Sequence, residues 1–432
     1  MKKLKVAIIG AGSTYTPELI NGFITRKSEL DLSSVYLMDI NKRKMEIVSQ
    51  LVIRMLNAAG MNTKVVLTES LDEAICDADY VLAQIRVGQL DARILDEKIP
   101  LKYDLLGQET TGAGGFMKAM RTIPVIMEIA TKVIALAPNA WLINFSNPSG
   151  LVAEAILSQL DIKMLGLCNG PINMLREAKN FIPADTEDFD YDFVGLNHLC
   201  WITSIYADGK EIMKDILHSG MEIEGLSNVP QADYDKELLR AVPGLPISYL
   251  NYYYFRYKQI EKCKKAEKTR GEVCKDIEKE LLELYQKEDL DKCPEELSKR
   301  GGALYSEAAV SIINAIENDK NEIHVVDVKN KGAYSFMGDN DVVETKCIIN
   351  RNGATPIKLE NFSDEYIIGL MQAVKAYEKL AAKAAIHGSF NDALAALMVH
   401  PLIGDYHKAK AVLDEMLEAN KQYLPQFYLK EK

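Results

Sequence analysis

The sequence predicts an α/β protein built on a doubly wound parallel sheet, followed by a second, α+β domain. Two observations carry this prediction. Short apolar segments alternate with helical patterns over the first 170 residues, and a glycine-rich turn, GAGSTYTPEL, follows the first apolar segment. We therefore expect one domain over residues 1–170 and an α+β domain over residues 171–432.

Six apolar segments are expected to be the parallel strands, because they are rich in Val, Ile and Leu and end near Gly, Asp or Asn. In chain order they cover residues 4–9, 35–40, 63–67, 80–85, 141–145 and 163–167. Residues 41–59 and 116–137 carry apolar side chains at helical spacing. Continuous apolar strands separated by helices predict a sheet that is covered on both faces.

The pattern changes after Cys168. Residues 190–206, which contain DFVGLNHLCWITSIY, predict one strand. Helical patterns follow over 249–264, 271–287 and 304–318, and two more strands are expected over 322–328 and 342–349. The highly charged stretch from 261 to 293 is typical of a solvated helical face.

Composition excludes several classes of function. The net charge of -11 disfavours nucleic acid and anionic membranes as partners, since both require clustered cations. The seven cysteines are odd in number and form no CxxC pair, which favours a reducing, cytoplasmic location over a disulfide framework. The sequence contains neither a signal-peptide pattern nor an apolar segment of about 18 residues.

The glycine turn predicts a Rossmann-like dinucleotide site and the architecture of lactate and malate dehydrogenases. The turn follows a strand, and Asp39 closes the next strand, where a carboxylate suits the two ribose hydroxyls of NAD rather than NADP. A tight turn without a ligand is the alternative. The cofactor-binding residues that we expect are Gly10, Gly12, Ser13, Thr14, Asp39 and Arg43.

Tyr15 occupies the position where the usual fingerprint has its third glycine. A bulky ring prevents close contact between helix and strand, so we expect the helix to begin later and to stand farther from the sheet. Thr16 is the expected N-cap, and Pro17 suits the first helical turn.

Four polar segments lie where strands of the sheet are expected to end: RVGQLDAR with the nearby GQETTGAGG, then NFSNPSG and CNGP. In a doubly wound sheet these ends face one crevice, where ligands bind. Any one segment could be a turn, but four at one edge, together with the glycine turn, predict a binding site.

These motifs, together with GLNHL, resemble those of the NAD-dependent family 4 glycoside hydrolases, and within that family the 6-phospho-β-glucosidases. The resemblance covers nearly the whole chain, including DVVETKCIINRNGATPI near residue 350. It implies NAD and a divalent metal, Mn2+, as cofactors. It also implies a phosphorylated β-glucoside such as cellobiose 6-phosphate as substrate, and a homo-oligomer, either dimer or tetramer.

The resemblance also implies an oxidative route of hydrolysis. NAD+ takes a hydride from C3 of the sugar, and the resulting ketone acidifies the hydrogen at C2. A base removes that proton while the metal stabilises the enediolate, and the leaving group on C1 is eliminated. Water then adds and the hydride returns, so no net redox change occurs.

Cys168 and His198 match the family's metal ligands. Two protein ligands leave coordination positions open for sugar oxygens, as in a catalytic site. Ligand softness alone would equally allow Zn2+, Fe2+ or Co2+. Taken singly, Cys168 could be a small buried hydrophobe and His198 a core histidine.

Tyr249 matches the family's general base, which needs a neighbouring cation because a free phenol has a pKa of about 10. Its assignment competes with the adjacent tyrosines of LPISYLNYYYF. Glu109 matches a position that raises the basicity of this tyrosine, and the alternative is a capping or loop carboxylate.

Arg93, Asn147 and Arg270 match substrate-binding positions, where arginine would hold the 6-phosphate. Arg270 could instead be one more charge on a solvated helix. Asn169 stands where α-specific members carry an aspartate as proton donor to the leaving oxygen. An amide cannot be that acid, which fits the β-specific branch.

Three other functions stay open from the sequence. An NAD-dependent 2-hydroxy-acid dehydrogenase would share the cofactor fold but would accumulate NADH and need no metal-binding cysteine. A family 4 glycosidase could act on another sugar, such as a 6-phospho-α-glucoside or an α-galactoside. An NAD-sensing regulator would bind the cofactor without turnover.

Overall fold

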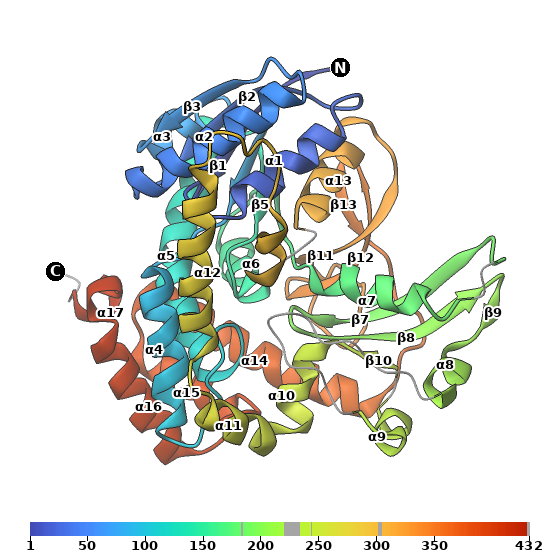
Figure 1. Cartoon of the computed structure of the whole chain (residues 1–432). Helices are drawn as coiled ribbons and strands as arrows, with labels where there is room; N and C mark the ends of the chain where they lie inside the picture. Colours follow the sequence, from blue (N-terminus) through green and yellow to red (C-terminus); the bar gives the residue numbers. More distant parts are fainter. Residues whose placement is uncertain (183–184, 220–233, 243, 301–304, 430–432) are drawn as a thin grey trace.

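A twisted sheet lies at the centre of the molecule (Figure 1). The structure is a computed structural model that describes residues 1–182, 185–219, 234–242, 244–300 and 305–429. Within those residues the central sheet has nine strands, in the order β13-β12-β11-β6-β5-β4-β1-β2-β3. The six N-terminal strands are parallel, as predicted: β1 (Lys3–Ile9), β2 (Asp31–Met38), β3 (Lys64–Thr68), β4 (Tyr80–Ala83), β5 (Trp141–Asn144) and β6 (Met164–Gly166).

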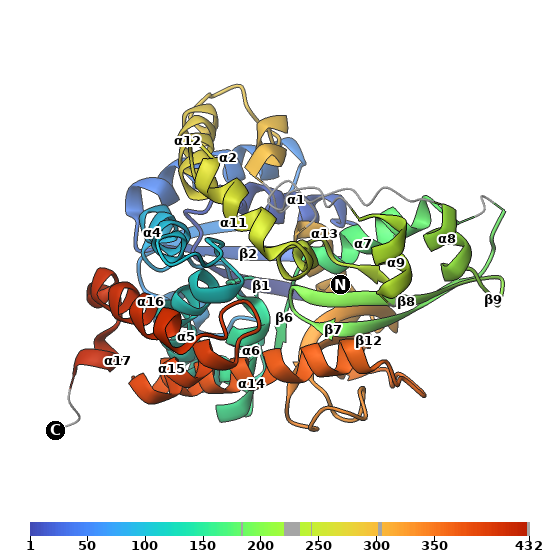
Figure 2. The same cartoon turned by 90° about the horizontal axis from the view of Figure 1, so that it is seen from below.

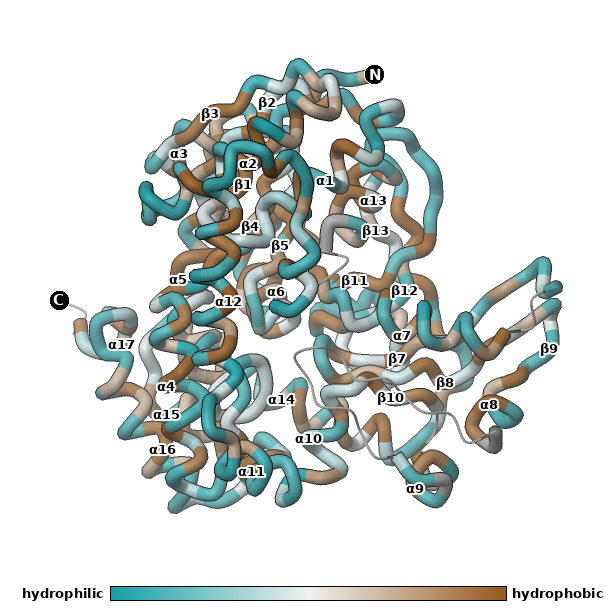
Figure 3. The backbone as a smooth tube through the Cα atoms, in the orientation of Figure 1, coloured by the Kyte–Doolittle hydropathy of each residue, from teal (hydrophilic) through white to brown (hydrophobic). Residues whose placement is uncertain are grey.

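Helices cover both faces of this sheet. Val6 and Ile8 of β1 point into one core, whereas Ala7 and Ile9 point into the other. The first core is shared with α1 (Thr16–Thr25), α2 (Lys42–Ala58), α12 (Arg270–Tyr285) and α13 (Tyr305–Glu317). The second is shared with α5 (Gly112–Leu136), α6 (Ser149–Gln159) and α14 (Glu365–His387). In Figure 3 hydrophobic colour follows the central strands and their packed helices, and the outer turns are mostly hydrophilic.

The C-terminal half extends the same sheet. Strands β11 (Glu322–Lys329), β12 (Val342–Asn350) and β13 (Gly353–Pro356) pair antiparallel beside β6, so the complete sheet is mixed. The two strands expected at 322–328 and 342–349 are thereby confirmed. The predicted division after residue 170 falls at the first residue of α7 (Gly170–Lys179), and it stays a prediction because later strands return to the first sheet.

Residues 190–206 form a hairpin and not the single strand that the sequence predicted. Strands β7 (Phe189–Leu196) and β8 (Leu199–Ala207) pair antiparallel, and Asn197 and His198 form the turn between them. The left-handed backbone of His198, with φ of 64°, reverses the chain within a continuous apolar stretch. With β9 (Lys210–Glu211) and β10 (Leu245–Pro246) this hairpin forms a second sheet, which extends away from the body (Figure 2).

The helices predicted over 41–59, 116–137, 271–287 and 304–318 are confirmed as α2, α5, α12 and α13. The single helix predicted over 249–264 is wrong, because the chain divides there into η1 (Ser248–Leu250), α10 (Asn251–Tyr254) and α11 (Arg256–Lys265). Phe255, with ψ of 37°, departs from helical geometry and separates α10 from α11.

Other helices surround these layers, and none of the helices in the described ranges is both long and apolar enough to cross a membrane. The remaining described helices are α3 (Leu71–Ile75), α4 (Gln89–Leu101), α8 (Met213–Ser219), α9 (Lys236–Ala241), η2 (Glu295–Arg300), α15 (Phe390–Val399), α16 (Tyr406–Ala419), η3 (Lys421–Tyr423) and α17 (Pro425–Tyr428).

A buried ion pair joins three helices. Arg121 of α5 donates from Nη1 and Nη2 to the two carboxylate oxygens of Asp96 on α4, at 2.9 and 2.6 Å. Nη1 also donates to Oδ1 of Asn420, just beyond α16, at 2.8 Å. Arg121 is 2% exposed and Asp96 is fully buried, so neither charge can be satisfied by water.

Replacing Arg121→Met is expected to lower the free energy of unfolding by about 3–5 kcal/mol, because it leaves Asp96 buried without its partner. Urea unfolding followed by circular dichroism measures the change. The matched control is Lys132→Met, which breaks a partly exposed pair with Asp72 and should change stability by less than about 1 kcal/mol. Equal losses for the two variants would contradict the importance of the buried pair.

Candidate active site

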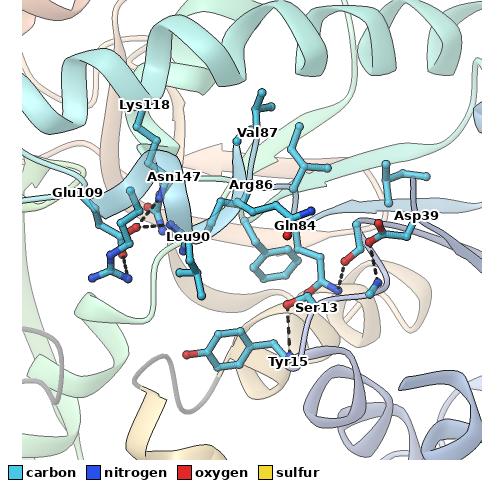
Figure 4. A pocket seen from close by; sticks show the side chains of 18 of the residues that line it. Ser13, Tyr15, Asp39, Gln84, Arg86, Val87, Leu90, Glu109, Lys118 and Asn147 are labelled. Carbon is cyan, nitrogen blue, oxygen red and sulfur yellow. Dashed lines mark hydrogen bonds and ion pairs between the residues drawn. The ribbon is translucent and has the colours of Figure 1, made fainter. Parts of the chain in front are cut away.

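One large cavity, of about 1110 Å³, opens at the carboxyl edge of the parallel strands. Its volume exceeds the roughly 300–1,000 Å³ of most small-ligand pockets, which leaves room for a dinucleotide and a sugar together. Figure 4 shows Asp39 and Ser13 toward one end, and Glu109, Lys118 and Asn147 toward the other. The predicted crevice at this edge therefore exists, and polar groups line both of its ends.

The glycine turn approaches its neighbours so closely that side chains would not fit. A Cβ on Gly10 would lie 2.9 Å from the carbonyl oxygen of Gln84, and the φ of Gly10 is +89°. A Cβ on Gly12 would lie 2.9 Å from Oδ2 of Asp39. Asp39 in turn accepts hydrogen bonds from the backbone N–H groups of Gly12 and Asn41, both at 2.7 Å. This cradle, with its carboxylate at the end of β2, fits a dinucleotide.

The start of α1 differs from the prediction. Tyr15, and not Thr16, is the N-cap residue, and its side chain makes no capping hydrogen bond. Thr16 lies in the first turn, where its hydroxyl donates to the carbonyl of Ala11 at 2.9 Å and accepts from Nε2 of Gln84 at 2.7 Å. The prediction missed this because a β-branched hydroxyl can bond backward to the turn as readily as forward to the helix.

The other predicted cofactor residues are divided between the cavity and its surroundings. Ser13 lines the cavity, whereas Thr14 is fully buried behind it. Arg43 is exposed on α2 and does not line the cavity. Lys44, one residue farther along the helix, does. Helical spacing explains the difference, because adjacent residues face directions about 100° apart.

Glu109 lies at the centre of a cluster of cations. Its carboxylate contacts Nη1 of Arg86, Nη1 of Arg93 at 2.9 Å and Nζ of Lys118 at 2.9 Å. Burial by itself would raise the pKa of Glu109, but Arg86, Arg93 and Lys118 together hold it well below its usual range. Glu109 is therefore ionised at neutral pH and cannot act as a proton donor there.

Lys118, which sequence reasoning missed, is the lysine of this cluster. It projects from the buried face of α5 and is 4% exposed. Burial, followed by the charge of Arg86, lowers its pKa to about 7, and Glu109 only partly counteracts this. A lysine among apolar residues in GAGGFMKAM was the available signal, since such a residue is seldom buried without a role.

Arg93 is placed in the cavity but is already paired. Its Nε donates to Glu97 at 2.8 Å, and its Nη1 contacts both Glu109 and Sγ of Cys274. The side chain is 5% exposed. Arg86, whose side chain is 27% exposed, is the arginine of this pair with more freedom to meet a ligand.

Asn147 follows β5 and precedes a cis peptide bond to Pro148. Its side chain lines the cavity, beside Lys118 in Figure 4. Its Oδ1 is buried and has no hydrogen-bond partner within the described residues. A buried acceptor without a partner is costly, so this atom is suited to receive a hydroxyl from a bound ligand.

Cys168 and His198 lie behind the cavity wall. Cys168 ends the segment after β6, is 4% exposed, and accepts a hydrogen bond from the N–H of Gly170 at 3.3 Å. Burial raises the pKa of this thiol well above its usual value, and Glu344 adds to the effect. His198 is 5% exposed, and burial lowers its pKa to about 3, so the imidazole is neutral. A neutral imidazole and a thiol that can lose its proton form a donor pair that fits a divalent cation.

Tyr249 faces His198. Their rings stack with centroids 4.2 Å apart, and Tyr249 lines the cavity from η1. The neighbouring tyrosines have other surroundings: Tyr253 stacks on His400, and the hydroxyl of Tyr254 accepts a hydrogen bond from Nε1 of Trp201 at 3.1 Å. Tyr249 is therefore the member of this tyrosine group that reaches both the cavity and a predicted metal ligand.

Buried carboxyl groups support the turn that carries His198. Nδ2 of Asn197 donates to Oε1 of Glu344 at 3.0 Å. Burial raises the pKa of Asp327 to about 7, and burial together with Asp327 raises that of Glu344 well above its usual range. The charged forms of these carboxyl groups are disfavoured by burial, and a nearby cation would stabilise them. Among the residues that the structure describes, no three His, Cys, Asp or Glu side chains form a metal-binding group.

Two predicted site residues, Asn169 and Arg270, differ in whether they reach the cavity. Asn169 is the N-cap of α7 and lines the cavity. Arg270 begins α12 outside the cavity lining, and its Nη2 donates to the carbonyls of Lys299 and Arg300 at 2.9 and 3.0 Å. Arg300 itself lines the cavity and was missed, because it stands in the charged segment PEELSKR, which resembles an ordinary solvated surface.

Comparison with known proteins places this geometry in a family. Family 4 glycosyl hydrolase matches residues 5–182, and the Family 4 glycosyl hydrolase C-terminal domain matches residues 193–403. A probable 6-phospho-beta-glucosidase of Bacillus subtilis (strain 168) is 41% identical over 99% of both chains. Lactate dehydrogenase from Eimeria maxima, at 16% identity and a TM-score of 0.55, shares the fold alone and confirms the expected dehydrogenase-like architecture.

A solved relative has nearly the same backbone. The 6-phospho-beta glucosidase from Thermotoga maritima, in a structure with NAD and glucose-6-phosphate, is 36% identical, with a TM-score of 0.90 over 98% of this chain and 99% of that one. A second structure of that enzyme contains manganese, NAD+ and glucose-6-phosphate, with 35% identity and a TM-score of 0.87 over 97% and 99%. Because both family matches and the full-length identity agree with the architecture and cavity described above, the chain belongs to glycosyl hydrolase family 4.

Proposed function

We propose that this chain hydrolyses 6-phospho-β-glucosides to glucose 6-phosphate and an aglycone, using NAD and a divalent metal. The observation that carries the proposal is the joining, in one cavity, of a dinucleotide cradle at Gly10 and Gly12 with a tyrosine, Tyr249, stacked on His198. The relatives named above are called 6-phospho-β-glucosidases, which supplies the substrate class.

Residues that line the cavity and residues behind its wall would together hold the cofactors. Gly10 and Gly12 allow the pyrophosphate to approach the backbone, and Asp39 would accept the ribose hydroxyls. Cys168 and His198 would supply a sulfur and a nitrogen ligand to the cation. When bound, NAD supplies reversible hydride transfer at C3, and the cation supplies positive charge where a sugar oxygen becomes negative.

Tyr249 would act as the base that removes the proton from C2. Its hydroxyl belongs to a side chain that is 8% exposed and packs against His198, so little bulk water competes for the proton. Asn147 would orient the sugar by accepting a hydroxyl hydrogen at Oδ1, an atom with no hydrogen-bond partner among the described residues. Glu109 would hold Arg86, Arg93 and Lys118 in fixed positions at this end of the cavity.

Asn169 supports the β-specific assignment. Its side chain lines the cavity at the N-terminus of α7, where a carboxylic acid could protonate a leaving oxygen. An amide offers a hydrogen bond but has no proton to transfer at neutral pH. The aglycone therefore leaves without receiving a proton from Asn169. Cleavage of its bond to C1 must then be driven by removal of the proton from C2.

The proposal is tested with p-nitrophenyl 6-phospho-β-glucoside, NAD+ and Mn2+ in D2O. The expected result is release of nitrophenol without net NADH, with deuterium at C2 of the glucose 6-phosphate, because the proton leaves and returns there. The matched control is the unphosphorylated glucoside. Net accumulation of NADH would identify a dehydrogenase instead, and hydrolysis without deuterium at C2 would exclude the elimination route.

Replacing Tyr249→Phe is expected to lower kcat by about 100-fold or more, because a positioned base contributes roughly 10²–10⁴. Equilibrium binding of NAD, measured by titration calorimetry, should change little. The control is Tyr253→Phe, whose ring packs on His400 away from the cavity lining. Parallel loss of NAD binding and kcat in the Tyr249 variant would remove it from the base role.

Affinity for Mn2+ should increase as pH rises through the neutral range. The thiol of Cys168 has a raised pKa, so a cation that binds the thiolate must displace a proton. Calorimetric titrations in buffers of different ionisation enthalpy measure the protons released. Replacing Cys168→Ser should weaken binding and abolish this pH dependence, and an unchanged dependence would show that Cys168 is not a ligand.

A further inference from the structure

Arg300 lies buried over the glycine turn, although it comes from the far half of the chain. It ends η2, is 7% exposed, and lines the large cavity. Its guanidinium carbon lies 4.9 Å from the centre of the Tyr15 ring, and its Nη1 donates to Oγ1 of Thr14. Tyr15, which replaces the usual third glycine, therefore makes a cation–π contact with Arg300.

The backbone around Arg300 is held in place by α12. At the start of this helix, Nη2 of Arg270 donates to the carbonyls of Lys299 and Arg300. At its end, the hydroxyl of Tyr285 donates to the carbonyl of Thr14 at 2.7 Å. Both ends of the helix therefore fix the arginine relative to the glycine turn, which is the preorganisation that a binding residue requires.

Arg300 and Lys44 share a single carboxylate, that of Glu278, as their ion-pair partner. Nη2 of Arg300 is 3.4 Å from Glu278, and the same carboxylate also pairs with Lys44. A buried arginine usually has a closely matched anion, because its charge is expensive to remove from water. One carboxylate shared between two cations leaves room for a further negative group in the cavity.

We propose that Arg300 binds a phosphate group in the cavity, beside the glycine turn. A planar guanidinium with parallel N–H donors matches the oxygens of a phosphate. The inference rests on the proposed function, which brings two phosphate-bearing molecules to this cavity: the dinucleotide and the 6-phosphorylated sugar. Contact with Thr14 of the glycine turn favours the pyrophosphate of the dinucleotide.

The test compares ligands with and without phosphate in equilibrium binding to wild-type protein and to Arg300→Met. One arm uses ADP-ribose and adenosine, and the other uses glucose 6-phosphate and glucose in the presence of NAD. We expect Arg300→Met to weaken ADP-ribose binding by about 10- to 100-fold while adenosine binding stays unchanged. A loss confined to glucose 6-phosphate would assign the same contact to the phosphate of the sugar.

Two further variants separate phosphate binding from a structural role. Lys299→Met removes an exposed charge from the same short helix and should change neither arm. Arg300→Lys keeps the charge but loses the fork, so it should recover part of the affinity, and it replaces Arg300→Met if that variant fails to fold. Equal weakening of adenosine and ADP-ribose, or no change in either arm, would overturn the proposal. Hydrolysis by the wild-type protein is measured separately, so a negative result here leaves the proposed function standing.

Discussion

The hydrogen-bonded register of the parallel strands determines where the functional groups of this chain can lie. Ile9 of β1 pairs with Met38 of β2 and with Ala83 of β4, and Ala83 pairs with Asn144 of β5. The last residues of these strands therefore form one row. The loops that follow must leave the sheet at a single edge, and the glycine turn, Asp39, Asn147 and Cys168 come together there although they are distant in sequence.

Buried charge is the second feature that shapes the site. Glu109 contacts Arg86, Arg93 and Lys118 at the same time in a largely buried region, and this keeps the three cations in fixed positions. Burial, together with the charge of Arg86, lowers the pKa of Lys118 to about 7, although a free lysine titrates far above that. Removing Glu109 would leave the three cations without their shared counter-ion, so the cluster acts as one unit.

The second half of the chain completes a site that the first half only begins. The hairpin turn brings His198 against Tyr249 of η1, at a centroid separation of 4.2 Å. From the other side, α12 and η2 carry Arg300 to Thr14. Strands β11–β13 extend the first sheet, so these parts are joined through a common core. A cavity that is lined both by the glycine turn and by Tyr249, whose ring stacks on His198, follows from this arrangement.

The sequence by itself determined the parallel strands, the glycine turn and several of the residues that line the cavity, because hydrophobic period and strand-end chemistry are local properties. Gly10, Asp39 and Asn147 were found in this way. The hairpin at His198, the N-cap at Tyr15, and the placement of Lys118 and Arg300 were decided only by tertiary structure. Each depends on which distant segment packs against the residue, and neither the period of a helix nor the spacing of a motif contains that information.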